Sequence, residues 1–252
     1  MVVFMSMNLH SHTELSLINA DQRDAMNRMY RLQRHVYDAS RRYYLLGRDQ
    51  LIADLNVPPG GTVLEAGCGT GRNLIMAAER YPQSRLFGFD ISDEMLKCAR
   101  AGIVRRGLGD RVRVAQGDAL DFSAAEAFGI PVFDRIYFSY TLSMIPGWET
   151  ALRHACTMLA ERGALHVADF GQFEALAEPL RQLMFAWLKQ FRVSPRQALR
   201  SEFNALAEEL GGRSTFNAHH RGYDWHLCLH AGTRSVEPAL SSSPPGTRHR
   251  AR

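Results

Sequence analysis

The chain has 252 residues, a length that accommodates one α/β domain with a full core and does not require a second. Its hydrophobic fraction of 46% is ordinary for a soluble globular protein, and no apolar run reaches membrane-spanning length. The N-terminus lacks the apolar stretch and cleavage site of a secretory signal, so we expect a cytoplasmic protein.

The formal net charge of +4 is mildly basic, which is compatible with an anionic partner such as a membrane surface or a nucleic acid. Part of this charge lies in the Ser-, Pro-, Gly- and Arg-rich residues 232–252, which we expect to be disordered. The cysteines are widely spread and form no C-x-x-C pair. We therefore predict reduced thiols, no disulfide framework and no metal site.

We expect residues 1–20 to be flexible and residues 21–231 to form a single domain. Apolar positions at helical spacing run from about residue 21 to residue 55, with an interruption near Gly47, and predict helices that precede a sheet. Residues 58–61, Pro-Pro-Gly-Gly, form the turn into the first strand.

Strand and helix patterns alternate after this turn. The predicted strands are 62–66, 85–90, 112–116, 133–139 and 164–169, and the predicted helices are 73–80, 93–105 and 148–161. This alternation predicts an α/β fold with a Rossmann-like, doubly wound and mostly parallel sheet. Residues 214–219 and 223–230 predict a closing hairpin, which adds an antiparallel strand near the C-terminus.

A helical insertion is predicted before that hairpin, at about residues 173–210. It carries an apolar face with basic residues nearby, formed by Leu180, Leu183, Met184, Trp187, Leu188 and Phe191. A basic amphipathic helix with Trp can lie in a membrane interface, which suggests peripheral contact with an anionic membrane. Core packing or a lid over the active site also explains the pattern, and we favour this alternative.

The most informative feature is the first strand, which runs directly into the turn Gly67-Cys68-Gly69-Thr70-Gly71. Glycines let the backbone turn sharply and approach a ligand, here at the carboxyl end of a strand in an open sheet. The spacing G-x-G-x-G differs from the G-x-G-x-x-G of dinucleotide-binding turns. Glu65 beside the turn would repel a pyrophosphate and attract a cationic ligand.

Acids follow the next two strands as well. Asp90 ends the second strand, about 20 residues past the turn, where a carboxylate hydrogen-bonds ribose hydroxyls. Asp118 follows the third strand in the sequence Gln-Gly-Asp-Ala. The predicted ligand therefore has a ribose and a positive charge but no phosphates, and S-adenosyl-L-methionine fits this description.

These residues resemble those of the class I S-adenosylmethionine-dependent methyltransferases, over about residues 30–231. The resemblance implies that Gly67 and Gly69 contact the methionine part, Asp90 the ribose and Asp118 the adenine amine. The predicted cofactor site also includes the neighbouring or N-terminal residues Tyr43, Arg48, Glu65, Ile91, Ala119 and Ser139.

The methyl acceptor is a separate question. Nucleic-acid amine methyltransferases often carry Asn/Asp-Pro-Pro-aromatic after the fourth strand, whereas this chain has Ser-Tyr-Thr-Leu at 139–142. We therefore expect a lipid or other small-molecule acceptor and no nucleic acid. Residues 37–49 resemble the start of the betaine-lipid methyltransferases, which implies trimethylation of diacylglyceryl homoserine. The Tyr residues of this segment can stabilise a sulfonium or quaternary ammonium through their ring faces.

Direct displacement of the methyl group by a neutral amine needs alignment and no dedicated nucleophile. Candidate proton acceptors are Tyr140, His219 and His220. The alternation of His226, Cys228 and His230 could bind a metal, although a central strand explains it equally well. Alternative functions are methylation of a quinone precursor, S-adenosylmethionine binding without catalysis and, less favoured, a nicotinamide-dependent dehydrogenase.

Overall fold

A computed structural model of the chain describes residues 45–232. The predictions for the flexible N-terminus, the helices before Gly47, the C-terminal tail, and Tyr37, Tyr43 and Tyr44 lie outside the described residues. The account that follows concerns residues 45–232 alone.

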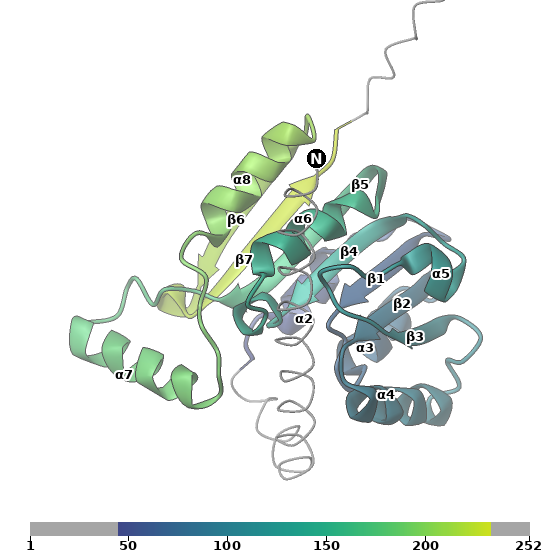
Figure 1. The fold of residues 1–252 in the computed structure, drawn as a ribbon, viewed down its shortest axis with the longest axis horizontal. Helices are drawn as coiled ribbons and strands as arrows, with labels where there is room; N and C mark the ends of the chain where they lie inside the picture. Colours follow the sequence, from purple (N-terminus) through teal and green to yellow (C-terminus); the bar gives the residue numbers. More distant parts are fainter. Residues whose placement is uncertain (1–44, 233–252) are drawn as a thin grey trace, which may run out of the picture.

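One seven-stranded sheet forms the centre of the molecule, with the strand order β3-β2-β1-β4-β5-β7-β6 (Figure 1). The strands are β1 Thr62–Ala66, β2 Arg85–Asp90, β3 Val112–Gln116, β4 Phe133–Ser139, β5 Leu159–Phe170, β6 Arg213–His219 and β7 Asp224–His230. The β1–β2, β2–β3, β1–β4 and β4–β5 pairs are parallel. Strand β7 runs antiparallel to both β5 and β6, which confirms the predicted fold class.

Helices cover both faces of the sheet. The helices α2 Arg48–Asp54, α3 Arg72–Arg80 and α4 Asp93–Arg105 pack on one face. The helices α5 Ala124–Phe128, α6 Trp148–Thr157 and α8 Leu199–Glu209 pack on the other. Every residue of β1 is buried, as expected for a central parallel strand covered on both sides.

The predicted boundary between α6 and β5 is wrong, because α6 ends at Thr157 and not at residue 161. Strand β5 begins at Leu159, five residues before the predicted start, and Leu159 pairs with Phe133 at the beginning of β4. The register shifts between Phe133 and Arg135, and Arg162 has a φ of 60°. Pairing with β4 therefore overrides the local helical pattern of residues 159–161.

The predicted insertion contains two helices with different surroundings. Helix α8 packs against the sheet, whereas α7, Glu178–Gln190, stands apart from it at the lower left of Figure 1. The inner side of α7 joins a separate buried group that we call the α7 cluster, formed by Leu45, Tyr140, Phe170, Phe173, Leu188 and Val193.

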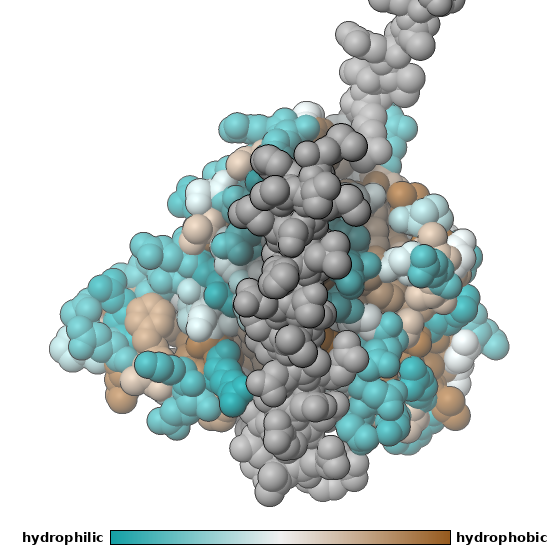
Figure 2. Space-filling view, viewed as in Figure 1, coloured by the Kyte–Doolittle hydropathy of each residue, from teal (hydrophilic) through white to brown (hydrophobic). Residues whose placement is uncertain are grey.

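The apolar face predicted for α7 divides into two parts. Leu188 is buried, and Met184, Trp187 and Phe191 pack partly buried against the α7 cluster. Leu180 and Leu183 face solvent, with 46% and 62% of their surface exposed. Over α7 the surface in Figure 2 mixes hydrophobic with hydrophilic residues. Within residues 45–232 no helix has the length and apolar character needed to span a bilayer.

Candidate active site

The site lies where the sheet changes its winding direction. Strand β1 has β2 on one side and β4 on the other: the connection after β1 leads to β2, and the connection after β3 returns past β1 to β4 on its other side. The glycine turn folds over the end of β2, because the N–H groups of Gly67 and Cys68 both donate to the carbonyl of Phe89 at 2.9 Å.

The two predicted glycines serve the turn for different reasons. Gly67 has a φ of +72°, and a Cβ there would lie 2.3 Å from Cγ2 of Thr141. Gly69 has a φ of +53°, but a Cβ there would meet no atom within 4 Å. Gly67 is therefore required by packing within the protein, whereas Gly69 borders open space in which a ligand can approach the backbone.

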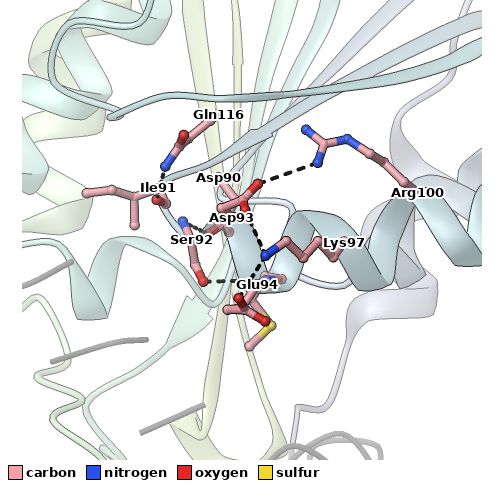
Figure 3. Close-up of polar contacts among 9 residues, drawn as sticks. Asp90, Ile91, Ser92, Asp93, Glu94, Lys97, Arg100 and Gln116 are labelled. Carbon is pink, nitrogen blue, oxygen red and sulfur yellow. Dashed lines mark hydrogen bonds and ion pairs between the residues drawn. The ribbon is translucent and has the colours of Figure 1, made fainter. Parts of the chain in front are cut away.

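Asp90 connects the turn to the next helix. Its Oδ2 accepts from the N–H of Gly69 at 2.8 Å and its Oδ1 from the N–H of Ser92 at 2.9 Å. Ser92 in turn caps α4, because its Oγ accepts from the N–H of Met95. Figure 3 shows Asp90 and Ser92 beside the first turn of α4. The ribose contact of Asp90 stays a prediction.

The end of β3 reaches the same edge. The N–H of Gly117 donates to the carbonyl of Asp90 at 3.1 Å, and the Gln116 amide donates to the carbonyl of Ile91 at 3.2 Å (Figure 3). Asp118 Oδ1 accepts from the N–H of Leu120 at 3.1 Å, which fixes the loop that also carries Ala119. The structure therefore brings Ile91, Asp118 and Ala119 together with Asp90, and the adenine contact of Asp118 and the cofactor contacts of Ile91 and Ala119 stay predictions.

Glu65 is buried in β1, with 1% of its surface exposed. Its Oε1 accepts from the Asn73 amide at 2.9 Å, and the hydroxyl of neighbouring Tyr137 faces the same carboxyl group. Burial raises the pKa of Glu65 to about 8, and the nearby Asp90 carboxylate acts in the same direction. The ligand-free protein therefore holds Glu65 neutral at pH 7, and a cationic ligand would favour its ionised form.

Buried polar atoms without a hydrogen-bond partner gather near this edge of the sheet. Within residues 45–232 such atoms belong to Asn73, Ser139 and Gln172, whereas the other polar atoms of this group face one another, Glu65 with Tyr137, Ser143 with Asp169 and Asp224 with His226. Because buried polar atoms in proteins are normally hydrogen-bonded, the three remaining atoms favour a polar ligand. The amine, carboxylate and hydroxyl groups of S-adenosylmethionine are suitable partners, so the donor set fits the predicted cofactor.

Residues 45–48 are linked to the site through Tyr140 and Glu65. The Tyr140 hydroxyl donates to the carbonyl of Leu46 at 2.5 Å, and Arg48 Nε donates to the carbonyl of Leu45 at 3.0 Å. The Arg48 charge acts on Glu65 and lowers the pKa of that carboxyl, against the larger effect of burial. Arg48 therefore lies close enough to act on Glu65, and its contact with the cofactor stays a prediction.

The three candidate proton acceptors have different surroundings. Burial raises the pKa of Tyr140 well above its usual range, which makes its phenolate unavailable near neutral pH. His219 is exposed, with its ring centroid 4.9 Å from that of His226. His220 has its Nδ1 2.5 Å from Oδ1 of Asp224, a buried carboxylate. Asp224 was not predicted as a site residue. Its only signal in the sequence is the presence of an acid four residues after the candidate His220.

The alternating residues of β7 do not form one group. His226 lies near Asp224, whereas Cys228 Sγ is 3.3 Å from His230 Nε2 and 3.7 Å from His166 Nε2. Burial raises the pKa of the Cys228 thiol to about 11, so it is neutral. In the described part of the chain, no three His, Cys, Asp or Glu side chains are arranged to hold a metal ion.

Comparisons with known proteins agree with this geometry. Residues 63–163 match the model of a family described as Methyltransferase domain. A tRNA1(Val) (adenine(37)-N6)-methyltransferase of Porphyromonas gingivalis is 34% identical over 113 residues, which cover 41% of this chain and 44% of that protein. A demethylmenaquinone methyltransferase of Geobacillus kaustophilus is 29% identical over 131 residues, which cover 52% and 50%. The chain thus spans about half the length of these curated relatives.

Solved structures share the fold. The S-adenosylmethionine-dependent methyltransferase SibL in its apo form aligns with a TM-score of 0.60 and 20% identity, covering 79% of this chain and 58% of that one. A methyltransferase of this class from Aquifex aeolicus aligns with a TM-score of 0.56 and 16% identity, covering 76% and 93%. With the family match, these findings support the predicted enzyme class, an S-adenosylmethionine-dependent methyltransferase, and its cofactor.

The open space at Gly69 yields a first prediction. We expect Gly69→Ala to weaken S-adenosylmethionine binding at least tenfold, since the new methyl group fills the ligand's approach. Its positive φ costs about 1–2 kcal/mol of stability in any L-residue. Gly107→Ala is the matched control, because Gly107 also has a positive φ and open space but lies in the loop after α4. Calorimetry and thermal melting should show similar destabilisation in both variants and lost binding only in Gly69→Ala; equal affinities would remove Gly69 from the site.

Glu65 yields a prediction about pH. Its folded-state pKa of about 8 lies above the ordinary 4.5, so the ligand-free protein should lose stability as pH rises from about 5 to 8. Affinity for S-adenosylmethionine should rise over the upper part of this range as the carboxylate forms. The α-amino group of the ligand titrates near pH 8 as well, so the measurement is the difference between wild type and Glu65→Gln. Identical pH profiles of binding and stability in the two proteins would contradict this role.

Proposed function

We propose that the chain is an S-adenosylmethionine-dependent N-methyltransferase that acts on the amino group of a lipid headgroup. The resemblance of residues 37–49 suggests diacylglyceryl homoserine as the acceptor. The observation that carries the proposal is the position of the α7 cluster beside the cofactor edge. Tyr140 belongs to both, because it follows β4 directly, bonds to Leu46 and packs its ring 4.8 Å from that of Phe170.

The cofactor supplies an electrophilic methyl group on a sulfonium. The chain's part is to bind, align and desolvate the reacting groups, which can provide much of the rate enhancement. The apolar side chains of the α7 cluster suit an acyl-bearing acceptor and favour the neutral form of its amine, because burial disfavours the ammonium.

The relatives suggest two other acceptors. The residues after β4, Ser-Tyr-Thr-Leu at 139–142, lack the Asn/Asp-Pro-Pro-aromatic sequence often found in enzymes that methylate nucleic-acid amines, which disfavours tRNA. A quinone precursor is the second candidate, because the α7 cluster also suits an isoprenoid chain and one relative is a demethylmenaquinone methyltransferase.

A panel of acceptors tests this proposal. Purified protein and labelled donor are incubated with diacylglyceryl homoserine, a demethylated quinol or tRNA, and products are identified by mass. We expect successive methylation of the lipid amine, slowed in Gly69→Ala when the donor concentration is limiting. Methylation of the quinol or tRNA alone would replace the lipid proposal. Donor binding without any turnover would favour a non-catalytic S-adenosylmethionine-binding protein.

Access to a lipid acceptor leads to a prediction about α7. We propose that Leu180 and Leu183, with Lys189 and Arg192 nearby, contact an anionic membrane surface. Leu180→Ser/Leu183→Ser should reduce sedimentation with phosphatidylglycerol vesicles about tenfold or more, because each buried Leu contributes about 1.5–3 kcal/mol. Melting and donor binding should not change, since both side chains are already exposed.

The matched control for the membrane contact is Val104→Ser, which removes another exposed apolar side chain, 74% exposed, from α4. This variant should sediment like the wild type. Wild-type sedimentation of the double α7 variant would show that these leucines do not contact the membrane, and the α7 helix would then be a lid or packing element.

A further inference from the structure

The turn between β6 and β7 carries a histidine and a carboxylate held together by a short hydrogen bond. His220 Nδ1 and Asp224 Oδ1 are 2.5 Å apart, and the Asp224 side chain is fully buried while that of His220 is 53% exposed. A carboxylate can only accept, so Nδ1–H donates and the lone pair of the neutral ring is on Nε2. The exposed face of this histidine therefore presents a proton acceptor.

This pair lies at the same edge of the sheet as the candidate active site. Asp224 begins β7 and pairs with Phe170, the last residue of β5. Its Oδ2 would lie 2.6 Å from a Cβ at Gly47, which is next to Leu46, the acceptor of the Tyr140 hydrogen bond. The segment that bonds to Tyr140 thus passes directly against the Asp224 carboxylate.

The turn itself is conformationally costly. His220 and Arg221 have φ values of 50° and 61°, which L-residues rarely adopt. Backbone hydrogen bonds from the N–H of Tyr223 to the carbonyls of His219 and His220 hold this conformation. Left-handed conformations at non-glycine residues are concentrated at functional sites, where the surrounding structure maintains them.

We propose that His220 is the proton acceptor of methyl transfer and that Asp224 is its positioning residue, an inference that rests on the proposed function. His220 Nε2 takes the proton that the acceptor nitrogen loses. The new N–C bond forms as the donor's C–S bond breaks, and its electron pair stays on sulfur. The imidazolium then returns its proton to water, to which the half-exposed ring has access.

The surroundings favour His220 over the other candidates. Burial raises the pKa of Asp224, but hydrogen bonds from His226 and His220 outweigh this effect and hold it below its usual range, so Asp224 is ionised at neutral pH. A buried carboxylate stabilises the imidazolium and fixes the tautomer of its partner. Tyr140 already donates its hydroxyl to Leu46, and no hydrogen bond orients the exposed His219 ring among the contacts that the structure describes.

Other ionisable groups surround the pair and bear on its pH dependence. On β7, His226 Nε2 lies 3.3 Å from Asp224 Oδ2. His219 at the end of β6 has its ring centroid 6.4 Å from that of His220, and Arg221 follows in the turn. Burial raises the pKa of Tyr140, and the Asp224 and Asp169 charges act in the same direction.

The test uses wild type, His220→Gln, Asp224→Asn and His220→Gly with the acceptor found in the panel. Turnover is measured from pH 5.5 to 9, and donor affinity by calorimetry. His220→Gln should lower kcat about 100-fold and abolish the acid limb of its pH profile. Asp224→Asn should also lower kcat, because the neutral amide no longer stabilises the imidazolium that forms during proton transfer. Donor affinity should change less than twofold in all variants.

Imidazole rescue separates chemistry from folding. Glycine suits the positive φ of residue 220, so His220→Gly should fold, and added imidazole should restore at least part of its turnover. His230→Gln, at the opposite end of β7, is the matched control and should keep the wild-type pH profile. Wild-type kcat in His220→Gln, or a loss that imidazole does not restore with an unchanged acid limb, would overturn the assignment. Absence of turnover in wild type with every acceptor would instead refute the proposed function, and this inference with it.

Discussion

The arrangement of the cofactor site depends on how one buried carboxylate is shared. Asp90 accepts hydrogen bonds from Gly69 in the turn after β1 and from Ser92 at the start of α4, so one side chain joins two connections of the sheet. Its main-chain carbonyl accepts from Gly117 after β3, which adds a third. Charge-assisted hydrogen bonds of this kind are stronger than neutral ones. Because the same carboxylate is expected to meet the ribose, ligand binding and the shape of the glycine turn are coupled through a single residue.

Much of this architecture could be predicted from the sequence, because its signals are local. The bounds of β1 to β4 and of α4 agree with prediction, since apolar runs there end at glycines, acids or turn residues. The predicted end of α6 was wrong because Leu159 pairs with Phe133, 26 residues earlier in the chain, and this pairing overrides the local helical pattern. The neutral state of Glu65 depends on depth of burial, and the role of Asp224 on a turn that brings His220 back onto β7. Neither is visible in sequence spacing.

Two buried carboxyl groups at this edge of the sheet, those of Glu65 and Asp224, differ in their protonation state near neutral pH. Glu65 is neutral in the ligand-free protein because burial outweighs the Arg48 charge, whereas Asp224 stays ionised because two histidines donate to it. The positive charge of a bound donor would favour the ionised form of Glu65. The ionised Asp224 suits a partner, His220, that must accept a proton and then release it. The two carboxyl groups therefore differ in function because they differ in partners, not in type or in burial.

The chain also divides between the two substrates. The family match ends at residue 163, after the turn, the acids of β2 and β3, and the residues that follow β4. The α7 cluster draws mainly on residues beyond that point, and so does the His220–Asp224 pair. Relatives with unlike acceptors, a tRNA adenine and a demethylmenaquinone by their names, each match only about half of this chain. Their acceptors therefore carry little weight for this chain, and the chemistry of the acceptor has to be inferred from this chain's own residues outside the family match.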